Sequence, residues 1–327
     1  MDDLAIRVKG LVKDYGEFRA VHGIDFDVRS GEVFGFLGPN GAGKTTTIKM
    51  LCTLLKPTEG EASVGGHNVL EDPMAVRKSI GIVFQEPTLD DRLTARENLK
   101  FHGILYGMNG DFLKRRIDEV LSLVELGEKA ENRVKTFSGG MKRRLELARG
   151  LMHTPRILFL DEPTLGLDPQ TRVHIWDYLR ALKKARSLSL FLTTHYLDEA
   201  ENCDRIAIID HGKIVALDTP SGLKALVHGD MVTMKTGDDA RAREFIKERY
   251  GIDAKIEENG FRVEVPSAEE WLPKFFGEAP VPVERLNLHR PTLEDVFIKL
   301  TGREIREEEG SWMDSARNVM RRRGGKK

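Results

Sequence analysis

A glycine-rich segment near the N-terminus has the residue types and the spacing needed to bind phosphate groups. GPNGAGKT (38–45) follows the apolar run VFGFL and precedes TTTIKMLCTLL, which has a helical pattern, as the pattern G-x-x-x-x-G-K-[ST] requires. Glycines allow a tight turn whose N–H groups approach phosphate oxygens, and a helix N-terminus adds about half a positive charge. Lys44 would supply a cation for the β- and γ-phosphates, and Thr45 a hydroxyl for Mg²⁺. The residues predicted to surround the phosphates are Gly38, Pro39, Asn40, Gly41, Ala42, Gly43, Lys44, Thr45 and Thr46.

Two adjacent carboxylates follow a second apolar run, RILFLDEP (156–163). Asp161, at the end of this predicted strand, is placed to hold Mg²⁺ directly or through water. Glu162 is the next residue and would point elsewhere, where it could polarise an attacking water as a general base. Carboxylates in this position can also simply cap a turn, but the upstream phosphate-binding pattern favours the chemical role.

A third motif, FSGGMKRRLELARG (137–150), resembles the signature sequence of the ATP-binding cassette (ABC) ATPases. The usual Leu and Gln at its first and fifth positions are replaced by Phe137 and Met141, while the Ser-Gly-Gly core is intact. The other motifs of this family appear in order along the chain, so that the resemblance covers residues 3–220. They are the aromatic residue Tyr15, the Q-loop residue Gln85, the D-loop Leu165-Gly166-Leu167-Asp168 and the switch histidine His195.

The resemblance implies that two copies of the chain enclose two ATP molecules. Ser138, Gly139 and Gly140 would lie at a helix N-terminus that reaches the γ-phosphate bound to the partner subunit. Asp168 would cross the same interface, although a plain helix cap before Pro169 is its strongest alternative role. Because the chain carries one complete set of motifs, a symmetric homodimer is expected.

The resemblance also implies roles for three single residues. Tyr15 would stack on adenine, Gln85 would contact Mg²⁺ or the attacking water, and His195 would hydrogen-bond the γ-phosphate. Together with Lys44 and Glu162, Gln85 and His195 form the predicted catalytic set. The alternatives are a half-buried strand tyrosine, a solvated loop glutamine and a core histidine. We interpret the basic run 142–144 as a solvated helix face rather than a nucleic-acid surface.

Apolar runs alternate with amphipathic stretches, which predicts an α/β fold with a largely parallel sheet. The expected strands are 33–37, 79–84, 156–163, 189–194 and 205–210, and the expected helices are 45–55, 111–126, 141–153 and 171–186. The opening segments IRVKGLVKDYG and GIDFDVRSGEV alternate with period two and predict antiparallel strands. With the resemblance, the expected fold of residues 1–220 is a P-loop NTPase of the ABC type, with a mixed sheet, an antiparallel β subdomain and a helical subdomain.

The pattern changes after about residue 220. Residues 221–302 predict the order βαββαβ and a closing helix, which is typical of a small ferredoxin-like α+β domain with an accessory or dimerisation role. Its hairpin, 254–266, is expected to turn at Asn259-Gly260. The tail 303–327 begins acidic and ends basic. It reads as a solvated terminus, with a weak contact to anionic lipid headgroups as the alternative.

Composition excludes several classes of protein. The chain has 327 residues, of which 40% are apolar and 31% charged, so it is a folding chain and not a disordered one. Its net charge of −1 gives no indication of a nucleic-acid partner. No run approaches the roughly 18 apolar residues of a membrane span, and MDDLAIRVKG lacks the core of a signal peptide. The two cysteines exclude a disulfide framework and fit a reducing compartment.

The family resemblance therefore calls for a separate polytopic membrane permease, which would bind at about residues 85–130 and hold the chain at the cytoplasmic face of the membrane. TTHYLDEAE (193–201) and PTLEDVFIKLTG (291–302) resemble stretches of daunorubicin-resistance-type exporter ATPases. The expected function is the ATP-driven motor of an exporter of a drug, lipid or polysaccharide. The alternatives are an importer ATPase, a non-transport ABC ATPase and a degenerate nucleotide-binding scaffold. The single cassette, the short spacing of its motifs and its intact acidic residues favour the exporter.

Overall fold

The computed structural model describes residues 4–186, 188–227, 229–257 and 259–302. These residues form two compact units, the first ending at Leu217 and the second beginning at Asp218. The predicted charged tail, 303–327, lies outside the described residues. Within the described part of the chain, no helix is long and apolar enough to cross a membrane.

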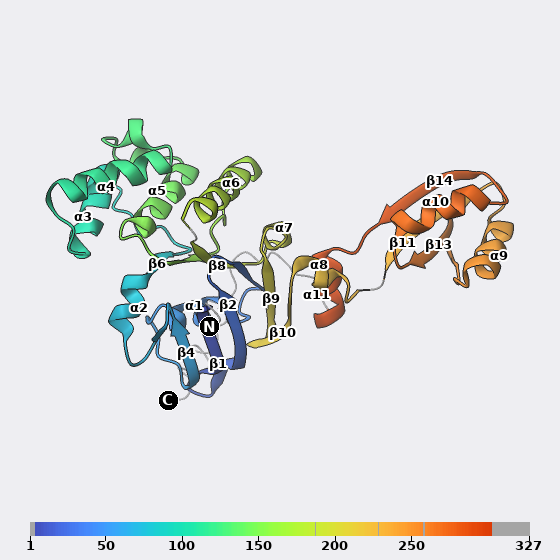
Figure 1. Cartoon of the computed structure of the whole chain (residues 1–327), viewed down its shortest axis with the longest axis horizontal. Helices are drawn as coiled ribbons and strands as arrows, with labels where there is room; N and C mark the ends of the chain where they lie inside the picture. Colours follow the sequence, from blue (N-terminus) through green and yellow to red (C-terminus); the bar gives the residue numbers. More distant parts are fainter. Residues whose placement is uncertain (1–3, 187, 228, 258, 303–327) are drawn as a thin grey trace, which may run out of the picture. The chain divides into compact units, whose positions relative to one another are not determined.

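A six-stranded sheet forms the centre of unit 1 (Figure 1). Its strands are β3 (Val33–Leu37), β6 (Ile80–Val83), β7 (Ile157–Asp161), β8 (Ser189–Thr194), β9 (Arg205–Asp210) and β10 (Lys213–Asp218), in the order β10-β9-β3-β8-β7-β6. The pairs β9–β3, β3–β8, β8–β7 and β7–β6 are all parallel, as predicted. Every residue of β3, β7 and β8 is buried, which explains why these strands are apolar throughout.

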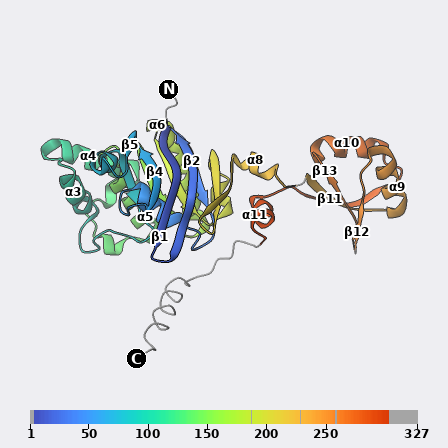
Figure 2. The same ribbon diagram turned by 90° about the horizontal axis from the view of Figure 1, so that it is seen from below.

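A second, antiparallel sheet packs against the first. It contains β1 (Leu4–Tyr15), β2 (Phe18–Arg29), β4 (Glu59–Val64) and β5 (His67–Asn68), in the order β2-β1-β4-β5. Figure 2 shows the long hairpin of β1 and β2, which the period-two pattern predicted. An aromatic core joins the two sheets, because Phe26 of β2 stacks on Phe34 of β3 at 5.5 Å and lies 6.0 Å from Phe191 of β8.

Some of the helices of unit 1 form a subdomain with a core of its own. The helices of this unit are α1 (Lys44–Leu51), α2 (Pro73–Ser79), α3 (Ala95–Leu105), α4 (Gly110–Leu123), α5 (Gly139–Leu151), α6 (Pro169–Arg186) and α7 (Leu197–Ala200), with short 3₁₀ turns at Gly127–Lys129 and Val134–Thr136. Helices α3, α4 and α5 share a core that includes Leu99, Ile117 and Leu145, so they form the predicted helical subdomain. Helix α1 ends at Leu51 rather than at residue 55, because Thr53 adopts a positive φ of 59°.

Unit 2 contains a four-stranded antiparallel sheet that shares its core with two helices, Asp239–Tyr250 and Ala268–Glu278. Its elements are α8 (Pro220–Lys224), β11 (Asp230–Thr236), α9 (Asp239–Tyr250), β12 (Lys255–Glu257), β13 (Gly260–Val265), α10 (Ala268–Glu278), β14 (Val283–His289) and α11 (Leu293–Thr301). The strand order β12-β13-β11-β14 and the element order βαββαβ are those of a ferredoxin-like unit. Val232, Phe261 and Phe275 are fully buried in its core. Gly260 begins β13 and pairs with Glu257, so it belongs to the strand rather than to the predicted turn.

Candidate functional site

The glycine-rich loop connects β3 to α1 and depends on its glycines for space as well as for conformation. A Cβ atom on Gly38 would lie 2.3 Å from the carbonyl oxygen of Ile209. Gly43 has a φ of 103°, and a Cβ atom there would lie 2.8 Å from the carbonyl oxygen of Ala20. The loop is therefore pressed against β2 and β9, and its backbone conformation is set by packing.

Lys44 is the first residue of α1, and its side chain turns back over the loop. It is only 4% exposed, and its Nζ donates to the carbonyl oxygens of Gly38 (2.7 Å) and Pro39 (3.1 Å). Nζ also lies 3.4 Å from Oε1 of Glu162. Burial lowers the pKa of Lys44, while the carboxylates of Glu162 and Asp161 act in the opposite direction. The structure thus places a cation at the centre of a loop of backbone groups, as phosphate binding requires.

Asp161 ends β7 beside the threonine at the start of α1. Its Oδ1 accepts hydrogen bonds from Oγ1 of Thr193 (2.6 Å) and Oγ1 of Thr45 (3.3 Å). Burial raises the pKa of Asp161, and the neighbouring charge of Glu162 adds to this, while the two hydroxyl groups lower it. A carboxylate and a hydroxyl in contact are the hard oxygen donors that Mg²⁺ prefers. Among the described residues, no group of three acidic, histidine or cysteine side chains converges on a metal position. Thr45 and Asp161 are the residues that would hold the ion.

Glu162 adopts a left-handed backbone conformation, with a φ of 47°. Its N–H lies within hydrogen-bonding distance of both the hydroxyl (3.1 Å) and the carbonyl oxygen (3.2 Å) of Thr193, on the neighbouring strand β8. This conformation directs the carboxylate to a position between Lys44 and His195, where Oε2 lies 3.4 Å from Nδ1 of His195. That distance allows electrostatic attraction, but the geometry falls short of a hydrogen bond. A positive φ in a non-glycine residue is typical of functional sites.

The charges around Glu162 decide its protonation state. Burial by itself raises the pKa of a carboxyl group. The nearby ring of His195 and the positive charge of Lys44 lower the pKa of Glu162 by more than burial raises it, so its pKa lies below the usual value. Glu162 is therefore a carboxylate at neutral pH. His195 directly follows β8 and is 8% exposed. The structure thus brings Lys44, Thr45, Asp161, Glu162 and His195 into one cluster.

The signature and D-loop residues lie at the N-termini of two neighbouring helices. Ser138 caps α5 by accepting a hydrogen bond from the N–H of Met141 (3.3 Å). Asp168 caps α6 by accepting from the N–H (2.9 Å) and the hydroxyl (2.6 Å) of Thr171. A Cβ atom on Gly140 would lie 2.7 Å from Cγ2 of Thr171, so the two N-termini are adjacent. Within one chain, Asp168 therefore makes the helix cap that was its alternative role.

Tyr15, Gln85 and Ser138 lie apart from the buried cluster. Tyr15 ends β1 and is 49% exposed, with Nζ of Lys13 lying 5.5 Å from the centre of its ring. Gln85 is exposed in the loop after β6, and Ser138 is exposed at the start of α5. Among the described residues, no hydrogen bond or ion pair joins Tyr15, Gln85 or Ser138 to Glu162.

Two residues that contact residues 161–163, here called the catalytic loop because it contains the predicted base Glu162, were missed or misread in the sequence. Thr193 binds both acidic residues, as described above, and only its place in the strand before His195 hints at this. Arg143 was predicted to lie on a solvated helix face, and this prediction is wrong. Arg143 is only 7% exposed, because its guanidinium group binds backbone carbonyls at the end of β7.

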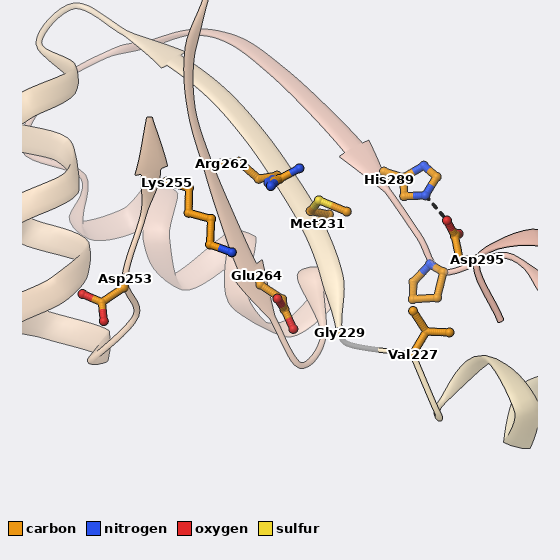
Figure 3. A pocket seen from close by; sticks show the side chains of 10 residues that line it. Val227, Gly229, Met231, Asp253, Lys255, Arg262, Glu264, His289 and Asp295 are labelled. Atoms are coloured by element: carbon orange, nitrogen blue, oxygen red, sulfur yellow. Dashed lines mark hydrogen bonds and ion pairs between the residues drawn. The ribbon is translucent and has the colours of Figure 1, made fainter. Parts of the chain in front are cut away.

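A cavity of about 200 Å³ lies in unit 2 (Figure 3). Its lining includes Lys255, Arg262 and Glu264 from the sheet, and His289 and Asp295 near the start of α11. Nε2 of His289 lies 3.1 Å from Oδ2 of Asp295, and Arg262 forms an ion pair with a glutamate of β12. Both acidic and basic side chains therefore line the cavity.

Comparison with known proteins agrees with this geometry. A family model described as ABC transporter matches residues 21–165. A daunorubicin resistance ATP-binding protein of Streptomyces coeruleorubidus is 40% identical over 311 residues, which cover 92% of this chain and 96% of that protein. A Nod factor export ATP-binding protein of Rhizobium sp. (strain N33) is 40% identical over 306 residues, or 93% and 99% of the two chains. The chain belongs to the ATP-binding proteins of the ABC transporter family.

Solved structures of this ABC family support the same conclusion for the fold. The cbiO1 protein of Clostridium perfringens, part of an ABC transporter complex, matches 76% of this chain and 96% of its own with a TM-score of 0.64 and 26% identity. An ATP-binding cassette solved as a dimer bound to ADP and Pi matches 65% and 98% with a TM-score of 0.60 and 28% identity. The chain is thus the ATP-hydrolysing subunit of an ABC exporter, and the importer and non-transport alternatives are not favoured. Family membership implies a membrane permease as partner and a dimer of ATP-binding subunits.

Proposed function

We propose that two copies of this exporter ATPase enclose two MgATP molecules and use their hydrolysis to drive a separate membrane permease from the cytoplasmic face of the membrane. The observation that carries the proposal is the buried cluster of Lys44, Glu162 and His195, in which both Lys44 and His195 lie 3.4 Å from the carboxylate of Glu162. A cation, a general base and a hydrogen-bond donor for the γ-phosphate converge there beside a phosphate-binding loop.

The proposed roles follow from the chemistry of each side chain. Lys44 and the loop amides bind the β- and γ-phosphates, and Thr45 and Asp161 hold Mg²⁺, which neutralises charge on the phosphate oxygens. Glu162 accepts a proton from the attacking water, and its lowered pKa keeps it ionised for that task. His195 hydrogen-bonds the γ-phosphate.

Two further residues complete the proposed site from more exposed positions. Tyr15 stacks on adenine. Gln85 reaches Mg²⁺ or the attacking water from the loop after β6, and its exposure leaves it free to reorient when nucleotide binds.

The dimer explains the exposed signature residues. Ser138 and Gly139 lie exposed at the start of α5, so the N-terminus of this helix is accessible to a phosphate group bound by another copy. Asp168 lies exposed at the start of α6, beside the same surface. The solved relative described above is a dimer bound to ADP and Pi, which supports this arrangement.

The proposed surface for the permease is the outer face of α3. Phe101, Ile104 and Leu105 are 63%, 54% and 67% exposed, and their spacing places them on one side of the helix. Phe112, at the start of α4, is also 57% exposed. An apolar surface of this kind is typical of a protein–protein interface, and it falls within the range 85–130 predicted for the permease.

The substrate class is proposed by analogy with the relatives. Their names refer to resistance to daunorubicin, doxorubicin or linearmycin, and to export of Nod factor. We propose a drug-like or lipid-like compound as the exported substrate, selected by the permease rather than by this chain. The net charge of −1 gives no support to a nucleic-acid partner.

The test is the variant Glu162→Gln, which keeps the shape of the side chain and removes the base. We expect its ATP turnover to fall by about 10²- to 10⁴-fold and the protein to become a dimer in MgATP, as measured by light scattering after gel filtration. The matched control is Lys44→Ala, which should remain monomeric because it loses the phosphate cation. Wild-type turnover in Glu162→Gln would contradict the assignment of the base, and a monomer at saturating MgATP would contradict the sandwich dimer.

A further inference from the structure

Arg143 connects the signature helix to the catalytic loop through buried hydrogen bonds. It lies on the second turn of α5, and its guanidinium group donates to four backbone carbonyls. Two belong to the proposed catalytic pair, Asp161 (3.2 Å) and Glu162 (3.0 Å), and the other two belong to Pro163 and Phe84. Burial lowers the pKa of Arg143, although Glu146 and other carboxylates act against this, and a guanidinium group stays charged in proteins.

The left-handed conformation of Glu162 explains how three consecutive carbonyl oxygens can meet one guanidinium group. With a φ of 47°, the chain turns at Glu162 so that the carbonyls of 161–163 face α5. The carboxylate of Glu162 points the other way, towards Lys44 and His195. The position of the carboxylate therefore depends on a strained turn whose backbone is held by Arg143.

The same network fixes both ends of the loop that contains Gln85. Phe84, directly before Gln85, gives its carbonyl oxygen to Arg143. Thr88, three residues after Gln85, donates its N–H to Oε1 of Glu146 (2.8 Å), whose Oε2 lies 3.1 Å from Nη1 of Arg143. Glu146 is 1% exposed, so this ion pair is buried.

We propose that Arg143 is a positioning residue for ATP hydrolysis. It holds the turn at Glu162 and the loop of Gln85 in register with the signature helix, and so keeps the carboxylate of Glu162 within reach of the attacking water. This inference rests on the proposed role of Glu162 and deepens it. It makes Arg143 responsible for the rate of hydrolysis and not for the affinity for ATP.

Arg116 provides a matched control within the same subdomain. Arg116, on α4, is 6% exposed and donates to the backbone carbonyls of Leu151 and Met152 at the far end of α5. It thus has the burial and the kind of contact that Arg143 has, but it does not touch the catalytic loop. A purely structural role for Arg143 would make Arg143→Gln and Arg116→Gln behave alike.

The experiment compares Arg143→Lys, Arg143→Gln and Arg116→Gln in the full-length chain, by steady-state ATP hydrolysis and by titration with a fluorescent ATP analogue. Lysine keeps the buried positive charge, so Arg143→Lys should fold, but its amine cannot bind four carbonyl oxygens at once. If Arg143→Gln fails to fold, Arg143→Lys alone decides the outcome. We expect Arg143→Lys to lower kcat by about 10- to 100-fold, since a misplacement of about 1 Å can reduce a rate by about 10²-fold. The dissociation constant of the analogue should change by less than about threefold. This is a small change in binding free energy, since 1.4 kcal/mol corresponds to about a tenfold change in the dissociation constant. Arg116→Gln should keep the wild-type kcat.

A double-mutant cycle with Glu162→Gln then separates this inference from the proposed function. If Arg143 acts through Glu162, Arg143→Lys should cause little further loss of single-turnover rate in the Glu162→Gln background. An equal loss in both backgrounds, a wild-type kcat for Arg143→Lys, or a loss confined to ATP affinity would overturn the positioning role. Wild-type hydrolysis by Glu162→Gln alone would instead overturn the assignment of the base.

Discussion

His102 provides a quantitative prediction about the helical subdomain. It lies on α3, its Nε2 atom is buried without a hydrogen-bond partner among the described residues, and its ring centre lies 5.0 Å from that of Tyr106 and 6.2 Å from that of His153. Burial, with the positive charge of Arg149 and the neighbouring His153, lowers the pKa of His102 from 6.5 to about 4. The folded protein therefore holds this imidazole neutral at a pH at which the unfolded chain protonates it.

The sign and size of the effect follow from this difference. Because the pKa of His102 is lower in the folded state, its contribution to stability is complete above pH 6.5 and is lost as the pH falls from 6.5 towards 4. Between pH 8 and pH 5.5, the unfolded state gains about 1.4 kcal/mol from protonation of this residue, and the full loss well below pH 4 is about 3.4 kcal/mol. The variant His102→Phe keeps an aromatic ring and removes the titration.

The assay is urea unfolding at a series of pH values for the wild type and for His102→Phe. We expect the free energy of unfolding of the wild type to fall by about 1.4 kcal/mol more than that of the variant between pH 8 and pH 5.5. Parallel curves for the wild type and His102→Phe would refute the reasoning.

Three further predictions concern the ATP site and the two units. Gly43→Ala should abolish binding in a titration with fluorescent ATP, because its Cβ atom would lie 2.8 Å from a carbonyl oxygen at a φ of 103°, whereas Gly127→Ala, with nothing within 4 Å, should bind normally. Tyr15→Ala should weaken ATP binding by about 5- to 150-fold in calorimetry, the equivalent of about 1–3 kcal/mol of stacking, and Tyr15→Phe should retain the affinity; equal losses would argue against stacking. Deleting 222–327 should leave ATP binding intact, because unit 1 has its own core, and loss of binding would refute this boundary.

Most of the fold could be predicted from the sequence because its strands are unusually uniform. The runs 33–37, 189–194 and 205–210 became β3, β8 and β9 with the predicted bounds, since strands covered on both faces must be apolar throughout. Helix α3 was not predicted, although its start carries a local signal. Thr94 and Glu97 form a capping box there, and this pair of residues could have been found in the sequence.

The residues of the buried cluster could also be found from the sequence, because they lie at the end of a buried strand or shortly after it. The roles of Arg143 and Thr193 could not be found in this way. A buried arginine is stable only where carbonyl oxygens converge on it, and those carbonyls come from residues about 20 and 59 positions away in the sequence. Sequence periodicity reports which face of a helix is apolar, but it does not report what a polar residue on that helix will meet.

These contacts make α5 the element that joins the predicted permease surface to the site of hydrolysis. Its N-terminus carries Ser138, Arg143 binds the catalytic loop, and Arg149, about 15 Å further along the helix axis from its start, donates to the carbonyl oxygen of Thr88 (3.0 Å). Helix α5 also shares its core with α3, whose outer face carries the exposed apolar side chains. Because an α-helix moves as a rigid body over this length, a displacement of α3 by a permease would move the signature residues, the loop of Gln85 and the turn at Glu162 together. Coupling of transport to hydrolysis would then depend on Arg143 and Arg149 as well as on Ser138.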